Sequence, residues 1–246
     1  MKKLEISVLL IFSLGLATGC AQKPKPYGEE TQLFLPGTQR QVWAVAPSIN
    51  ISGETSIDPL LQADLLYQEL QQVHGLTIIP VDRVVEVYAS LKINKVQSEQ
   101  QAYTVCQLLG CDGLVIPTIT AYDPYDPPKF GASLQLFMRP GHSQMLPKLD
   151  VRSLERSPTS AAASLPPMPG ASSNVLQVVD LYDAADGTVR DRIVAYAKGR
   201  TDPNAASAPG SITISMDRYC GFAYHELLVS LLDNLHQANV QEASAR

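Results

Sequence analysis

Hydrophobic residues in the first half of the chain alternate between a pattern typical of buried strands and one typical of helices. Residues 41–46 form a short apolar run that ends at Pro47, which predicts a buried strand. Asp58 and Pro59 then supply an N-cap carboxylate and a proline at the first helical position. The predicted helix ends near Gly75 and carries one apolar face, made of Ala63, Leu66, Leu70 and Val73.

The same alternation continues towards the middle of the chain. Residues 76–79 predict a second strand, and a helix with apolar residues at three-and-four spacing follows from Asp82. Ser98 begins a capping-box pattern that predicts a third helix, which Gly110 ends. Cys106 lies on the apolar stripe of this helix and is therefore expected to point into the core.

Two further strands are predicted on either side of a turn rich in proline and tyrosine. Residues 114–120 are apolar, although Pro117 removes a donor from the ladder and indicates an edge position or a bulge. Residues 131–138 alternate between apolar and polar side chains. The segment 122–128 between them predicts a stiff turn at which the chain leaves the sheet.

The last third of the chain predicts a hairpin and a long helix. Residues 175–182 and 188–198 are expected to be strands joined through an Asp-Gly turn, and residues 215–238 a helix. Residues 141–174 are rich in proline, serine and alanine and are expected to form a disordered insertion. The prediction is one α/β domain over residues 40–240, with a single mixed β-sheet of about five to six strands flanked by helices.

The N-terminal segment has the pattern of a targeting signal. Lys2 and Lys3 precede an apolar run of about eleven residues, whereas a spanning helix needs about twenty. Residues 16–20 resemble a bacterial lipobox, so we expect cleavage of residues 1–19 and lipidation of Cys20. Because Ala21 follows in place of aspartate, the periplasmic face of the outer membrane is the expected location. Residues 20–39 are expected to form a flexible, lipidated tether.

Composition excludes some functions and leaves others open. Without residues 1–19 the chain has 17 basic and 23 acidic side chains, a net charge of −6, so no basic surface for nucleic acid is implied. Cys106, Cys111 and Cys220 are an odd number of thiols besides Cys20. Small core residues are the favoured interpretation, and a disulfide between Cys111 and Cys220 stays open.

The chain shows no arrangement of residues typical of catalysis. The four histidines have no catalytic or metal-binding spacing, and His225 and Glu226 are expected on a solvated helix face. We expect no enzyme activity, no cofactor and no metal site. Tyr122, Tyr125 and Phe130 are candidates for a partner-binding edge, because rings on a stiff turn lose little entropy when they dock. The alternative is a loop packed on its own sheet.

One segment carries a resemblance to a known group of envelope proteins. The helix that ends in residues 108–113, the apolar strand at 114–116 and the turn at 122–124 resemble the curli-secretion-channel (CsgG-like) superfamily. The arrangement is also similar to the TolB N-terminal domain and to LpoB-like lipoprotein activators. Cys111 and Pro117 depart from the group's pattern, which usually has alanine and glycine there. The resemblance covers residues 40–138, the last hairpin and the last helix, and implies no catalytic residues.

The resemblance leaves two functions to choose between. A curli-type pore needs long amphipathic hairpins, and the proline-rich residues 141–174 do not supply them. The leading hypothesis is therefore a lipid-anchored periplasmic adaptor or regulator that docks an envelope protein through a sheet edge or through the tyrosine-rich turn. The alternative is an oligomeric structural subunit of a secretion or transport assembly.

Overall fold

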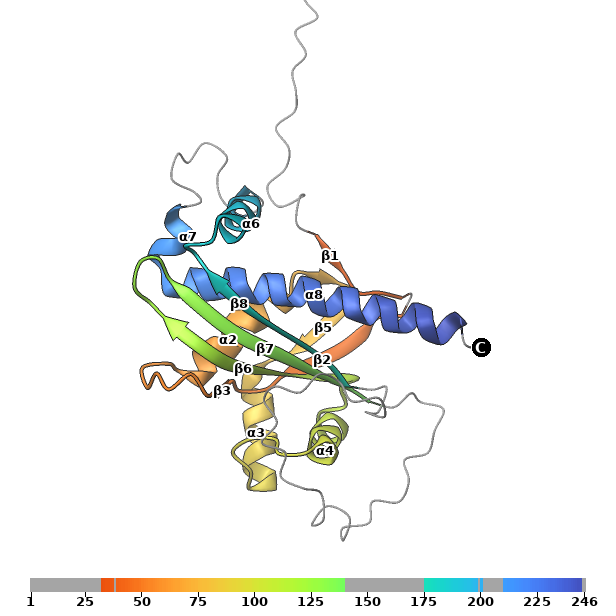
Figure 1. Ribbon diagram of the computed structural model, residues 1–246. Coiled ribbons are helices and arrows are strands. Elements are labelled where there is room, and N and C mark those ends of the chain that lie inside the picture. The colour runs from red at the N-terminus through yellow and green to blue at the C-terminus, as the bar shows by residue number, and fades with distance from the viewer. Residues whose placement is uncertain (1–31, 38, 140–174, 199, 201–209, 245–246) are drawn as a thin grey trace, which may run out of the picture.

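The protein contains one mixed six-stranded sheet with helices on both faces (Figure 1). The computed structural model describes residues 32–37, 39–139, 175–198, 200 and 210–244. The strand order is β5 (Leu76–Ile79), β2 (Gln41–Val45), β6 (Gly113–Asp123), β7 (Lys129–Met138) and β8 (Val175–Asp183), and β3 (Ile49–Asn50) also pairs with β6. The predicted single mixed sheet is confirmed. A separate two-stranded sheet joins β1 (Leu33–Phe34) to β4 (Val73–His74).

Helical connections account for the parallel part of the sheet. Helix α2 (Pro59–Leu70) lies between β2 and β5, and α3 (Val81–Leu91) and α4 (Glu99–Leu109) lie between β5 and β6. β5, β2 and β6 are parallel, whereas β7 and β8 are antiparallel to their neighbours. The predicted caps are present, since Asp58 accepts from the N–H of Leu60 and Ser98 from that of Gln101. These caps fix where α2 and α4 begin.

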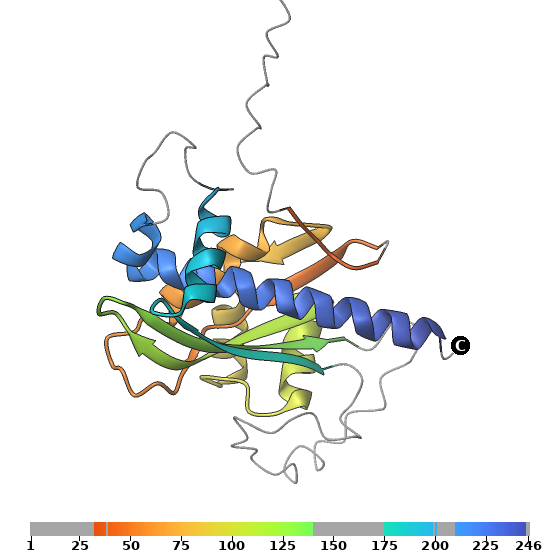
Figure 2. The ribbon, with the colours of Figure 1, turned by 45° about the horizontal axis from the view of Figure 1, so that its top comes forward.

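The two faces of the sheet carry different helix layers. Helices α2, α6 (Gly187–Lys198) and α8 (Met216–Ser244) contribute to the hydrophobic cluster on one face, with α7 (Gly210–Ile214) packed on α8. Helices α3 and α4 contribute to the cluster on the other face. Figure 2 shows α8 running along the first face and α3 and α4 below the second. The first cluster is the larger one.

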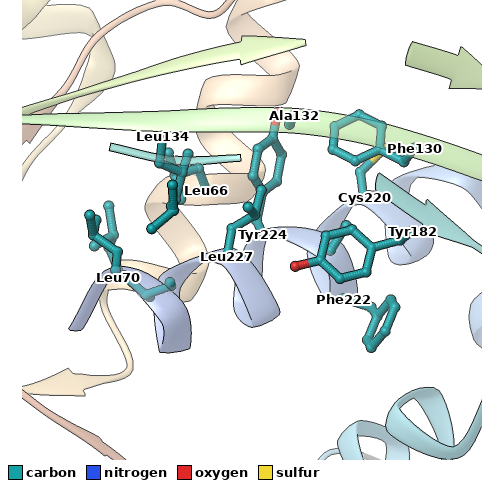
Figure 3. Close-up of a cluster of buried hydrophobic side chains, with 14 of the residues drawn as sticks. Leu66, Leu70, Phe130, Ala132, Leu134, Tyr182, Cys220, Phe222, Tyr224 and Leu227 are labelled. Carbon is teal, nitrogen blue, oxygen red and sulfur yellow. The ribbon is translucent and has the colours of Figure 1, made fainter. Parts of the chain in front are cut away.

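Aromatic rings fill the α8 side of the sheet. The rings of Phe130 and Tyr224 meet edge to face with centroids 5.3 Å apart, and those of Tyr182 and Phe222 do so at 5.7 Å. Figure 3 shows Phe130 and Tyr224 between β7 and α8, and Phe222 on the side of α8 that faces away from β7. Edge-to-face packing suits the positive rim and negative face of aromatic rings. The packing of these rings stabilises the contact between helix α8 and the sheet.

The prediction of a strand at residues 188–198 is wrong, because this segment is helix α6. Its buried residues, Val189, Ile193, Tyr196 and Ala197, recur at helical spacing. The Asp186–Gly187 pair suggested a hairpin turn, but Asp186 instead caps the helix: its carboxylate accepts from the N–H of Thr188 at 2.7 Å. The same side chains that favour a tight turn also favour a helix start.

Pro117 lies in an internal strand, so the predicted edge position is wrong. β2 pairs with β6 up to Val115, and β3 pairs with it from Thr118. The proline therefore lies where β6 changes its parallel partner, and its missing N–H interrupts no pairing there. The alternative prediction, a bulge, fits better, since the register shifts between Ile119 and Ala121.

Several predictions fall at the edge of the described residues or outside them. Cys20, most of the predicted tether and the insertion at 141–174 lie outside. The tether was expected to reach residue 39, but Leu33–Phe34 form β1 and Leu35 is buried. Within the described part of the chain, no helix combines the length and apolar character needed to cross a membrane.

Candidate partner-binding surface

Helices α3 and α4 cover only part of their face of the sheet. The residues packed in their cluster come from one end of the strands, namely Ala44, Ala46, Leu114, Ile116 and Phe137. The other end, where β6 and β7 meet in their hairpin, extends past these helices (Figures 1 and 2). We call this end of the face, which no helix among the described residues covers, the open face.

Strand register shows which residues make up the open face. Ile49 pairs with Thr118, Thr118 with Ser133, and Ser133 with Val179. Ile49 packs against the α3 and α4 cluster. Residues paired across neighbouring strands point to the same side of a sheet, so Thr118, Ser133 and Val179 also face the α3 and α4 side. Leu181 follows Val179 by two residues and therefore also lies on this face.

Three large aliphatic side chains are exposed on the open face. The exposed fractions are 60% for Val179, 57% for Leu181 and 50% for Ile51. Ile51 follows β3, and its N–H still donates to the carbonyl of Ile119 at 2.9 Å. Because Ile51 follows Ile49 by two residues, its side chain points to the same side of the sheet. Val179 and Leu181 lie two residues apart on β8, and Ile51 lies on the other side of β6 and β7 from them. Exposed apolar side chains on one face of a sheet are candidates for an interaction site.

Small residues form the floor between these aliphatic groups. A Cβ atom added to Gly131 would lie 2.8 Å from Oγ1 of Thr120, 3.1 Å from Cβ of Ala121 and 3.2 Å from Cδ1 of Leu181. Leu181 therefore lies flat over the glycine, next to the bulge in β6. Ser133 occupies the neighbouring row and is buried. A shallow apolar surface results, rather than a row of projecting side chains.

The outer edge of β8 borders the open face. The N–H of Leu181 donates to its neighbour Asp180 at 2.8 Å and therefore points away from β7. Because backbone groups alternate along an antiparallel strand, Val179 and Gln177 also direct theirs outward. Among the described residues, β8 is the last strand on this side of the sheet. Such an edge can accept an added strand.

The tyrosine turn lies at the hairpin end of the same region. Tyr125 is 80% exposed at the turn, whereas Tyr122 is half-buried and packs against Phe130 with centroids 6.3 Å apart. Phe130 itself is fully buried, so its ring is part of the core and is not available to a partner. The suggested partner-binding group therefore reduces to Tyr125 and one side of Tyr122.

An ion pair fixes the base of this turn to β8. Nζ of Lys129 lies 2.8 Å from Oδ2 of Asp183, its partner in the strand register. The hydrogen bond from Lys129 holds the pKa of Asp183 below its usual value, so both groups stay charged at neutral pH. The pair is exposed and contributes little to stability.

The buried polar group on the α8 side is structural. Glu69 Oε1 accepts from the hydroxyl of Tyr196 at 2.9 Å and from Nη1 of Arg200 at 2.7 Å. Nδ1 of His225 lies 3.3 Å from Oε2 of Glu69. The prediction that His225 lies on a solvated face is wrong, because it is 5% exposed and faces this carboxylate. The group ties α2, α6 and α8 together.

The described residues offer no metal site and no disulfide. No group of three or more His, Cys, Asp or Glu side chains in these parts of the chain could hold a metal ion. Cys106, Cys111 and Cys220 are thiols. Cys111 lies in the α3 and α4 cluster and Cys220 in the α8 cluster, on opposite faces of the sheet. The alternative of a Cys111–Cys220 disulfide is therefore wrong.

Comparison with known proteins gives distant structural similarities. No model of a known protein family and no curated protein matches the sequence significantly. The chain is similar to the lipoprotein GNA1162 from Neisseria meningitidis, at 17% identity over 40% of this chain and 69% of that one, with a TM-score of 0.32. It is also similar to the LpoB C-terminal domain from Escherichia coli, at 12% identity over 42% of this chain and 74% of that one, with a TM-score of 0.34.

A hypothetical protein covers more of the chain. CT253 from Chlamydia trachomatis is 13% identical over 79% of this chain and 97% of that one, with a TM-score of 0.40. The function of this chain therefore has to be inferred from its own residues.

Proposed function

We propose that this protein is a non-enzymatic adaptor or regulator of an envelope protein complex, and that it binds its partner through the open face and the β8 edge. The observation that carries the proposal is the exposure of Ile51, Val179 and Leu181 on one uncovered part of a sheet. Burying such a group removes apolar surface from water, at about 25 cal/mol per Å². The outward backbone groups of Gln177 and Val179 add hydrogen-bonding capacity at its border, whereas the N–H of Leu181 already donates to the carboxylate of Asp180.

Membrane anchoring through Cys20 determines which partners the domain can reach. The proposed location is the periplasmic face of the outer membrane, with acyl chains on Cys20 and no aspartate at the next position. Residues 20–32 can span at most about 45 Å when fully extended. A partner must therefore reach the domain within this distance of the membrane plus the width of the domain.

Tyr125 is proposed as a second contact beside the open face. Its ring is exposed at a turn whose backbone is fixed, since Asp123 accepts from the N–H of Tyr125 at 3.1 Å. A ring held in this way loses little entropy on binding. Tyr122 is half-buried, so only the exposed side of its ring can contact the partner.

The test is crosslinking of the full-length protein in native membranes, followed by purification. Leu181→Ser should remove most of the crosslinked partner, because it deletes an exposed aliphatic contact where the open face meets the β8 edge. Leu108→Ser is a matched control, since Leu108 is 56% exposed on α4, away from the open face. Equal capture by both variants would contradict the proposed surface.

The alternative function, an oligomeric structural subunit, predicts a different outcome of the same experiment. An open β8 edge can also pair with a second copy of the chain. Crosslinks between identical chains, with a mass by light scattering that falls on Leu181→Ser substitution, would favour the subunit over the adaptor. Tyr125→Ala tests the turn separately, and unchanged capture would remove the turn from the surface.

A further inference from the structure

The end of helix α4 brings two cysteines together. Gly110 has a φ of 69°, a left-handed conformation, and its N–H donates to the carbonyl of Gln107 at 3.3 Å. The N–H of Cys111 donates to the carbonyl of Cys106 at 3.0 Å. In helix ends with these two bonds, the side chains at the positions of Cys106 and Cys111 frequently contact each other, and both cysteines belong to one cluster here.

Both thiols are buried in the same apolar surroundings. Cys106 and Cys111 are 0% exposed and belong to the cluster under α3 and α4. Cys220, the other described thiol, lies on the far side of the sheet. The two cysteines therefore have only each other as a thiol partner among the described residues.

Their mutual contact makes the two thiols chemically unequal. The hydrogen bond from Cys106 lowers the pKa of Cys111, although burial acts against this. The same hydrogen bond, together with burial, raises the pKa of Cys106.

We propose that Cys106 and Cys111 form an intrachain disulfide when the domain meets an external disulfide. Because both thiols are buried, the end of α4 must first open locally. One cysteine then attacks, as its thiolate, one sulfur of the external disulfide, forms a mixed disulfide and releases the first thiol. The other cysteine loses its proton and attacks the sulfur of the first cysteine, which expels the second thiol. Two electrons and two protons pass from the cysteines to the oxidant, which leaves as two thiols.

The disulfide would stabilise the place where the end of α4 meets β2 and the residue that follows β7. Asp112, next to Cys111, accepts from the N–H of Val42 at 2.9 Å and lies 3.3 Å from Nη2 of Arg139. Its own N–H donates to the carbonyl of Val42 at 2.7 Å. A covalent bond across Gly110 therefore holds the end of α4, β2 and the exit of β7 in place. Oxidation should raise the midpoint of thermal unfolding.

The test is a peptide map of the full chain after equilibration with an excess of glutathione disulfide. After alkylation in denaturant, trypsin cleaves behind Lys95 and Lys129 and leaves both cysteines in one peptide, residues 96–129. We expect this peptide to be unalkylated and lighter by two hydrogen atoms than the reduced one, and reduction to reverse the change. Two alkyl groups, or a glutathione on each cysteine, would overturn the proposal.

Serine variants identify the pair. Cys220→Ser should keep the disulfide, whereas Cys106→Ser should leave Cys111 either alkylated or carrying glutathione. A peptide linked through Cys220 in the wild-type chain would overturn the assignment. The wild-type map is decisive even where a variant fails to fold. The inference does not depend on the proposed adaptor function.

Discussion

The two faces of strand β7 differ in side-chain size and in what covers them. On the α8 side, Phe130, Ala132, Leu134 and Leu136 are all fully buried. On the opposite side, the open face has Gly131 and Ser133, over which Leu181 and Val179 of β8 lie exposed. The hairpin half of β7 therefore contributes Phe130 and Leu134 to a helix-covered core, and Gly131 and Ser133 to a surface that no described helix covers.

This difference separates stability from binding within one sheet. Large side chains on the covered face fill space against α2 and α8, so removing them leaves cavities. Aliphatic side chains on the open face already contact water, so removing them costs the fold little. These exposed side chains can instead contribute to binding a partner. Substitutions on the two faces should therefore have different effects, which gives four tests.

The largest expected effect is that of Phe130→Ala on the covered face. Phe130 is fully buried against Tyr224, so truncation should lower the free energy of unfolding by about 3–5 kcal/mol. Urea unfolding followed by circular dichroism measures this. Tyr125→Ala, in the same turn region but 80% exposed, is the control and should change stability by less than about 0.5 kcal/mol. Equal effects would place Phe130 at the surface.

A smaller loss is expected from the charged group on the covered face. Glu69→Ala removes the partner of Arg200, Tyr196 and His225, and should cost about 2–4 kcal/mol because a largely buried cation loses its carboxylate. Glu86→Ala removes an exposed partner of Arg83 and should cost less than about 1 kcal/mol. Similar losses for both would show that the Glu69 group does not stabilise the contact between α2, α6 and α8.

The same carboxylate should make stability depend on pH. Burial raises the pKa of Glu69, but the hydrogen bonds with His225 and Arg200 outweigh it, and its pKa in the folded state lies below the usual value. Its contribution is therefore present above the unfolded pKa, about 4.3, and is lost as pH falls through the folded pKa. Chemical unfolding between pH 7 and pH 3 should show a shallower decline for Glu69→Gln than for the wild type. Parallel curves would contradict this.

Most of the strands and helices could be predicted because local signals and tertiary packing agree. The caps at Asp58 and Ser98 coincide with the observed helix starts, and so does the apolar stripe of α4 with its helix. Helix α2 ends at Leu70, short of the predicted end near Gly75, and Val73 of its predicted stripe lies in β4. Prediction failed at residues 188–198, where Asp-Gly permits either a turn or a helix start and packing on the core decides. Cys106 was predicted to be buried and is.

The candidate surface was less accessible to prediction. Tyr125 is exposed as a turn residue should be, but the position of Phe130 depends on strand register, which the hairpin determines. Val179 and Leu181 belong to an apolar run, typical of burial on both faces. Only the extent of α3 and α4 shows that one face there is uncovered. The sequence therefore pointed to Tyr122, Tyr125 and Phe130 as candidates and did not point to Val179 or Leu181.

The smallest effect on stability is expected for the open face. Val179→Ser with Leu181→Ser should change the free energy of unfolding by less than about 1 kcal/mol, because both side chains are already more than half exposed. The same double variant should lose most partner capture in membranes. Urea unfolding of the purified full chain and crosslinking in membranes measure the two properties. A loss of stability as large as that of Phe130→Ala would mean that these side chains are buried within the chain itself, and the two faces of the sheet would then no longer differ in role.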